Sequence, residues 1–87
     1  MPVSKAQAVV IGASAGAFDA LSAILPSLPV TFGLPVMVVV HLPPDKRSLM
    51  AGLFRHKCIL AVEEAEDKQP LCSGTIYFAP PDYHMLV

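Results

Sequence analysis

Apolar residues lie along the chain in short continuous runs, separated by polar or helix-patterned segments. Residues 8–12 (AVVIG) predict a short buried strand that ends at Gly12. Residues 35–41 (PVMVVVH) are a β-branched run without polar alternation, which predicts a strand buried on both faces. Residues 60–65 (LAVEEA) predict a third strand. Residues 75–80 (TIYFAP) alternate and predict a half-exposed strand, and residues 84–87 (HMLV) begin another.

A helix is predicted between the first two strands, over residues 16–25, because apolar residues there recur at helical spacing. Pro26 and Pro29 follow and end this helix. Its predicted buried face consists of Phe18, Leu21, Leu25 and Leu28.

A second helix is predicted after the second strand. Pro43 and Pro44 break the chain directly after His41, and Ser48 is a suitable cap for a helix that begins at Leu49. The alternation of strands and helices is typical of an open, parallel α/β sheet. The predicted inner face of the second helix consists of Leu49, Leu53 and Phe54.

The composition favours a small, well-covered sheet. Of the 87 residues, 54% are hydrophobic and 15% are charged, whereas a typical globular domain is about 25% charged. An apolar excess fits strands that are covered on both faces. A parallel sheet of this size would be marginal alone, so we expect the chain to be truncated, a part of a larger domain.

Charge and cysteine content exclude several classes of partner. The formal net charge of −1 provides no electrostatic footprint for nucleic acid or an anionic membrane. No apolar run approaches the roughly 18 residues that membrane insertion requires.

The acidic run at residues 63–67 is interpreted as solvated, and neither a metal site nor a cofactor is predicted. Cys58 and Cys72 have no metal or disulfide spacing, which favours reduced thiols in a cytoplasmic protein. The one basic cluster is interpreted as a solvated helix face and consists of Lys46, Arg47, Arg55, His56 and Lys57.

The turn after the first strand carries the strongest chemical signal. Residues 12–16 read Gly-Ala-Ser-Ala-Gly, which satisfies the G-x-S-x-G pattern between a predicted strand and a predicted helix. The Ser14 hydroxyl is therefore a candidate nucleophile, and the Ala15 N–H faces the developing oxyanion. A dinucleotide fingerprint fits less well because serine and Ala17 replace two of its glycines. Nucleotide or small-molecule binding by the same loop stays an alternative.

His41, at the end of the second strand, strengthens the hydrolase interpretation. In a right-handed βαβ unit, consecutive parallel strands point the same way, so Ser14 and His41 should both emerge at the carboxyl edge of the sheet. A histidine there can take the serine proton and return it to a leaving group. The alternative is a histidine that only ends a strand.

Several segments in order resemble the catalytic domain of the CheB-type protein-glutamate methylesterases of bacterial chemotaxis. The resemblance extends from about Ala8 to Val87. It implies a three-layer α-β-α fold with a mostly parallel, Rossmann-like sheet. It also implies hydrolysis of glutamyl methyl esters, and deamidation of glutamines, on chemoreceptors. The segments are VVIGASAGAFDAL (9–21), PVMVVVHLPPDKRSLM (35–50), VEEAED (62–67) and TIYFAPPDYHMLV (75–87).

The resemblance also assigns roles to individual residues. Ser14 matches the family's nucleophile, and His41 matches its general base. The family has a histidine at the position of His84, which implies that His84 lines the same cleft; a solvated histidine at the end of a loop is the alternative. Ala15 and Gly16, in the turn after Ser14, are the other predicted oxyanion and substrate-binding residues.

The family's third catalytic group, an aspartate in a Gly-x-x-x-Asp-Gly segment, has no counterpart before Val87. We therefore expect residues 1–87 to be the amino-terminal portion of a single catalytic domain, without a receiver domain and inert alone. An open sheet edge would then favour self-association. A catalytically silent interaction domain of the same fold is a further alternative.

Overall fold

The computed structural model describes residues 8–66 and 69–83, which form a parallel sheet with helices packed on it. The strands of the described chain are β1 (Val9–Ala13), β2 (Val36–Val40), β3 (Ala61–Glu64) and β4 (Thr75–Ala79). Its α-helices are α1 (Phe18–Ile24) and α2 (Pro44–Arg55), and short 3-10 helices, η1 (Ala15–Ala17) and η2 (Leu25–Ser27), flank α1.

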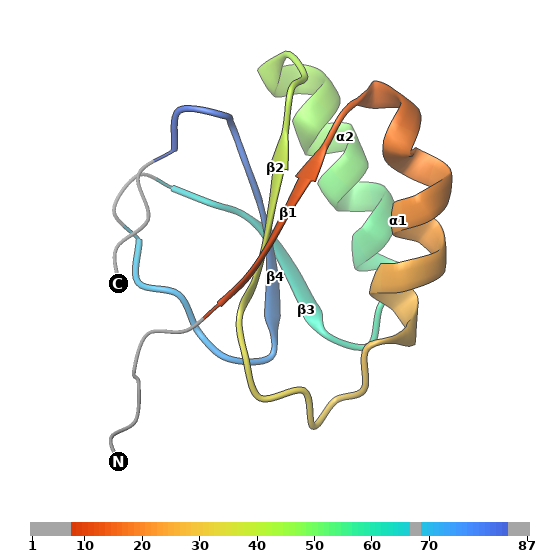
Figure 1. Ribbon diagram of the computed structural model, residues 1–87, viewed down its shortest axis with the longest axis vertical. Coiled ribbons are helices and arrows are strands. Elements are labelled where there is room, and N and C mark those ends of the chain that lie inside the picture. The colour runs from red at the N-terminus through yellow and green to blue at the C-terminus, as the bar shows by residue number, and fades with distance from the viewer. Residues whose placement is uncertain (1–7, 67–68, 84–87) are drawn as a thin grey trace.

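The strand order β1-β2-β4-β3 explains where the helices lie. All three strand pairs are parallel, and the chain moves in one direction across the sheet from β1 to β2 and on to β3. Right-handed crossovers therefore put α1 and α2 on the same face. The step from β3 to β4 goes backwards, so its connection covers the other face. Figure 1 shows both helices on one side of the sheet and the connection before β4 on the other.

These findings confirm the predicted α/β class with a parallel sheet. Within the described residues, both helices belong to a single layer, whereas the resemblance implies helices on both faces. The strand predicted over residues 84–87 lies outside the described part of the chain.

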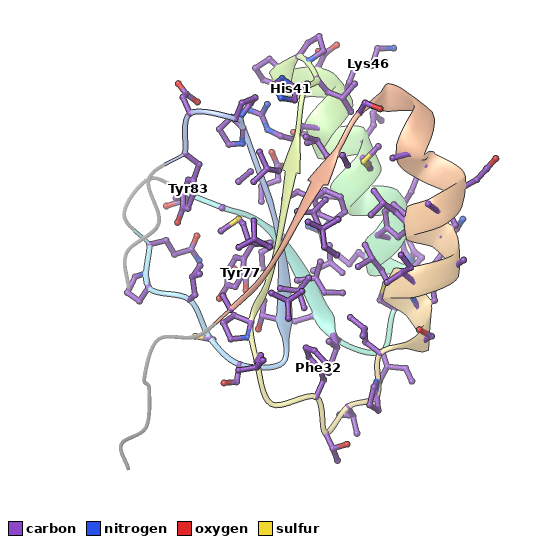
Figure 2. The ribbon with its side chains drawn as sticks, viewed as in Figure 1. Phe32, His41, Lys46, Tyr77 and Tyr83 are labelled. Atoms are coloured by element: carbon purple, nitrogen blue, oxygen red, sulfur yellow. The ribbon has the colours of Figure 1, made fainter. Side chains whose placement is uncertain are left out.

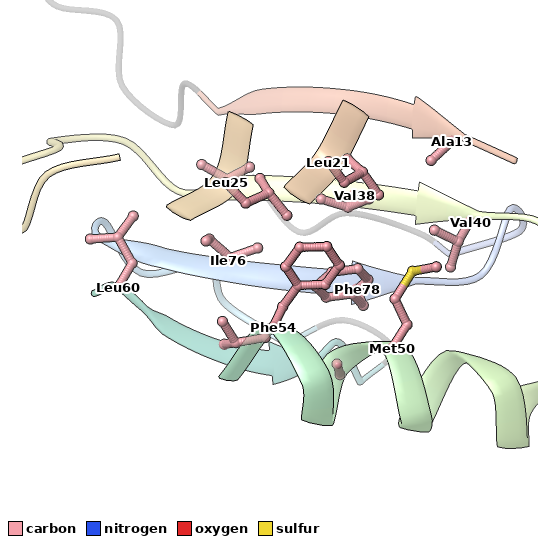
Figure 3. Packing of buried hydrophobic residues seen from close by; sticks show 13 residues of the cluster. Ala13, Leu21, Leu25, Val38, Val40, Met50, Phe54, Leu60, Ile76 and Phe78 are labelled. Carbon is pink, nitrogen blue, oxygen red and sulfur yellow. The ribbon is translucent and has the colours of Figure 1, made fainter. Parts of the chain in front are cut away.

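The main core lies between the sheet and the two helices (Figure 3). At its centre the Phe54 ring of α2 is fully buried, with ring centroids 5.5 Å from Phe18 and 5.6 Å from Phe78. Such spacings are favourable for aromatic pairs. Leu21 of α1 and Leu25 of η2 are buried as predicted, and the core thus joins both helices to β4.

The second helix differs from the prediction. It begins at Pro44 and not at Leu49, because proline is well tolerated in the first turn of a helix. Ser48 does not cap it; its hydroxyl donates to Glu64 Oε1 at 2.9 Å. The buried face contains Met50 and Ala51 beside the expected Phe54. Two predicted inner residues are exposed: Leu49 by 63% and Leu53 by 52%.

The prediction for β4 was also wrong: all five of its residues are buried. This strand lies between β2 and β3, so a neighbouring strand pairs with each of its edges. Other segments of the chain cover both of its faces. On the face opposite the helices, Tyr77 packs with Met37, and its hydroxyl accepts the Cys72 N–H at 2.8 Å. Burial raises the pKa of the Tyr77 hydroxyl.

Candidate active site

Ser14 and His41 emerge next to each other at the carboxyl edge of the sheet. Ala13 and Val40, the last residues of β1 and β2, are partners in the register, and each candidate residue follows directly. Adjacent strands lie about 5 Å apart. Figure 2 shows His41 at the end of β2. The structure therefore brings together the two residues that the sequence predicted to share this edge.

The backbone links the two positions. The His41 N–H donates to the Ala13 carbonyl at 3.4 Å, which extends the ladder to the residue before Ser14. Ala13 and Val40 are both buried in the core under the helices. Because successive residues of a strand point to opposite faces, the alternation predicts that residues 14 and 41 leave the sheet on the same side.

The Ser14 hydroxyl is not used in local structure. Ser14 is the N-cap of η1, where a serine side chain ordinarily accepts a backbone N–H. Here it makes no capping hydrogen bond, and the residue is exposed. Its backbone is extended (φ −110°, ψ 177°), without the strain of the nucleophile elbow in α/β-hydrolases. The hydroxyl is thus presented on a relaxed turn.

Ala15 and Gly16, the candidate oxyanion residues, form the first turn of η1. The first amide groups of a helix have no intrahelical acceptor, so these N–H groups lie at its positive end. Steric space does not require a glycine at position 16, because an added Cβ would have no atom of the described residues within 4 Å. Space next to Ser14 therefore stays open.

Neither the candidate His84 nor the acidic residue that follows His41 contributes to the described geometry. His84 lies outside the described residues. Asp45, the nearest acidic residue along the chain after His41, is exposed in the first turn of α2. In the part of the chain that the structure describes, no carboxylate is hydrogen-bonded to His41.

Three residues of the basic cluster make structural contacts that the sequence did not predict. The Arg47 Nη1 donates to the Leu42 carbonyl at 2.9 Å, one residue after His41. Arg55 Nε donates to the Val62 carbonyl at 3.1 Å, and Lys57 Nζ lies 5.0 Å from the centre of the Phe18 ring. Residue type alone could not reveal these contacts because their acceptors are backbone carbonyls and a ring from other segments.

The described residues contain no group of three or more His, Cys, Asp or Glu side chains that could hold a metal ion. Both cysteines are free thiols. Burial raises the pKa of the Cys58 thiol, and nearby Lys57 opposes this shift, whereas Cys72 is exposed. None of the helices in the described part of the chain is long and apolar enough to cross a membrane.

Comparison with known proteins establishes the relationship. Residues 9–87 match the family described as CheB methylesterase. The chain belongs to the CheB methylesterase family. The crystal structure of the Thermotoga maritima CheB methylesterase catalytic domain superposes with a TM-score of 0.83 at 38% identity. That match covers 93% of this chain and 43% of the Thermotoga chain.

Two relatives of this CheB-family chain show the same partial coverage. A protein from Leptospira interrogans is 40% identical over 81 residues, which are 93% of this chain and 42% of the relative. The protein-glutamate methylesterase/protein-glutamine glutaminase of Desulfotalea psychrophila is 39% identical over 95% of this chain and 23% of its own length. The chain thus spans less than half the length of the relatives it matches.

Proposed function

We propose that this chain supplies the nucleophile and the general base of a protein-glutamate methylesterase that also deamidates protein glutamines. The observation that carries the proposal is that Ser14 and His41 directly follow the paired residues Ala13 and Val40 at one sheet edge, with a serine hydroxyl that makes no capping bond. Membership of the CheB methylesterase family supports it.

The reaction follows the chemistry of an acyl-enzyme. His41 takes the proton of Ser14 Oγ as this oxygen attacks the glutamyl carbonyl carbon. The carbonyl π electrons move to oxygen, and the N–H groups of Ala15 and Gly16 stabilise the oxyanion. The carbonyl re-forms as methanol leaves with the proton from His41; for a glutamine, ammonia leaves. Water, activated by His41, then releases the carboxylate and restores the serine.

The remaining components of the proposal come from outside the described residues. A third group that orients His41 is expected from a segment of the natural protein beyond residues 1–87, and His84 is expected to line the substrate site. Loss of the orienting group in a triad enzyme can cost about 10⁴ in turnover. Residues 1–87 alone should therefore be inert or nearly so.

The proposed partner is a methyl-accepting chemoreceptor, and the proposed location is the cytoplasm. Free cysteines agree with a reducing compartment. We further propose that the isolated chain self-associates through β1, which forms one edge of the described sheet. No cofactor is needed, because serine and histidine supply both the nucleophile and the proton transfer.

A fluorophosphonate probe, applied to the natural protein, tests the assignment. We expect covalent labelling of the wild type and its loss in Ser14→Ala. The matched control is Ser73→Ala, because Ser73 is also exposed but lies in the turn before β4. Methanol release from a methylated receptor should follow the same order.

Labelling that persists in Ser14→Ala would disprove the nucleophile assignment, whereas absence of labelling in the wild type would favour a silent interaction domain. Thermal stabilisation by nucleotide without any labelling would instead favour the binding alternative.

A further inference from the structure

The segment that follows His41 has few backbone hydrogen bonds to hold it. Pro43 and Pro44 have no N–H, so the chain between β2 and α2 can donate only from His41 and Leu42. The His41 N–H is used, on the Ala13 carbonyl at 3.4 Å. This bond fixes the peptide unit before His41 but not the one after Leu42.

The Arg47 side chain holds the peptide unit that follows Leu42. From the first turns of α2, its Nη1 reaches back five positions and donates to the Leu42 carbonyl at 2.9 Å in a part-buried contact. The Arg47 N–H meanwhile donates to the carbonyl of Pro43, the N-cap residue of α2, at 3.0 Å. Arg47 thus attaches the His41–Pro43 turn to α2 by both its backbone and its side chain.

We propose that Arg47 is a positioning residue, which holds the turn after His41 so that the imidazole stays over the Ser14 edge of the sheet. This inference rests on the proposed function for its catalytic consequence, but the placement of His41 can be measured without catalysis. A guanidinium is suited to this task because its planar donors are fixed relative to one another and it is always charged.

Lys46 provides a matched control. It is the neighbouring residue on the same helix, has the same charge and is exposed, and the structure records no hydrogen bond or ion pair for it in the described chain. Figure 2 shows it at the same end of the molecule as His41. Any effect of positive charge near the site should therefore appear in Lys46→Ala as well as in Arg47→Ala.

The experiment uses the natural protein with ¹³C-labelled histidine, and His41→Gln assigns the His41 ring signal. In Arg47→Ala we expect the His41 signal to shift or broaden while the His56 signal stays. We expect kcat for methanol release to fall between about 10- and 100-fold with KM little changed, because misplacing a catalytic group by about 1 Å can cost about 100-fold. Arg47→Lys should recover part of both effects, since an ammonium can also donate to the Leu42 carbonyl. Lys46→Ala should match the wild type.

A wild-type His41 signal and wild-type kcat in Arg47→Ala would overturn the proposal. A second outcome would also overturn it. In this outcome, the His41 signal is unchanged, and kcat falls in Arg47→Ala and Arg47→Lys only in proportion to the fraction of unfolded protein. The two hypotheses fail separately: labelling that survives Ser14→Ala refutes the serine mechanism, whereas the ring signal decides the role of Arg47.

Discussion

Gly16 lies two residues after Ser14 in a turn that does not require glycine. Its φ is not positive, since Gly74 is the one positive-φ glycine of the described residues, and an added Cβ would meet nothing within 4 Å. Gly16→Ala should therefore raise the free energy of unfolding by about 0.5–1 kcal/mol, as replacement of a helical glycine generally does. In the natural protein, the change should also lower ester turnover about tenfold, equal to about 1.4 kcal/mol, because the methyl group enters the open space beside the nucleophile.

Gly52, in the interior of α2, is the control for this change. It also has open space around a Cβ but lies away from Ser14. Gly52→Ala should give the same gain in urea unfolding without loss of turnover. Equal turnover in both variants would show that the space at Gly16 has no role in substrate binding.

The positions of Ser14 and His41 could be predicted because each follows an apolar strand, and parallel neighbours end at the same edge. The contact of Arg47 with the Leu42 carbonyl could not be predicted in this way. It depends on the path of the Pro43–Pro44 segment, and backbone acceptors carry no signature in the residue types.

The orientation of α2 was misjudged because its apolar residues allow two faces. Leu49 and Leu53 have helical spacing, but so do Met50 and Phe54, and the latter pair faces the sheet. We expect Met50→Ala to lower the free energy of unfolding by about 2–3 kcal/mol, as loss of a buried methionine side chain does. Leu49→Ala should change it by no more than about 0.5 kcal/mol, since that side chain is 63% exposed.

Urea unfolding of the two variants under identical conditions measures this difference. Similar losses for Met50→Ala and Leu49→Ala would mean that α2 is rotated relative to the structure. The pattern of helical spacing is thus sufficient to predict that a helix exists, but packing against β4 and α1 selects its inner face.

The strand order illustrates what local patterns cannot convey. The parallel α/β class followed from the alternation of elements, but the insertion of β4 between β2 and β3 did not. That insertion depends on the connection before β4 crossing the other face of the sheet, and it makes every residue of β4 buried. The alternation of residues 75–80 predicted a half-exposed strand. The burial of this strand is instead determined by its long-range pairing with β2 and β3.

The same strand order leaves β1 at one edge of the described sheet, with Val10 55% exposed. β3, at the other edge, is short and carries the exposed Glu63 and Glu64, which discourage edge-to-edge pairing. β1 has no charged residue, so we expect the 87-residue chain to associate through β1 as its concentration rises. Val10→Lys should reduce this association, because a lysine on an edge strand opposes pairing with a second chain.

Sedimentation velocity over a range of concentrations measures the effect, with Val30→Lys as the control. Val30 is 70% exposed but lies in the connection before β2. Its replacement by lysine therefore removes a comparable apolar side chain without changing an edge strand. A wild-type chain that stays monomeric throughout would refute association through β1. Equal reductions in both variants would show that general surface hydrophobicity, and not the β1 edge, drives the contact, since only Val10 belongs to a strand with an unpaired side in the described sheet.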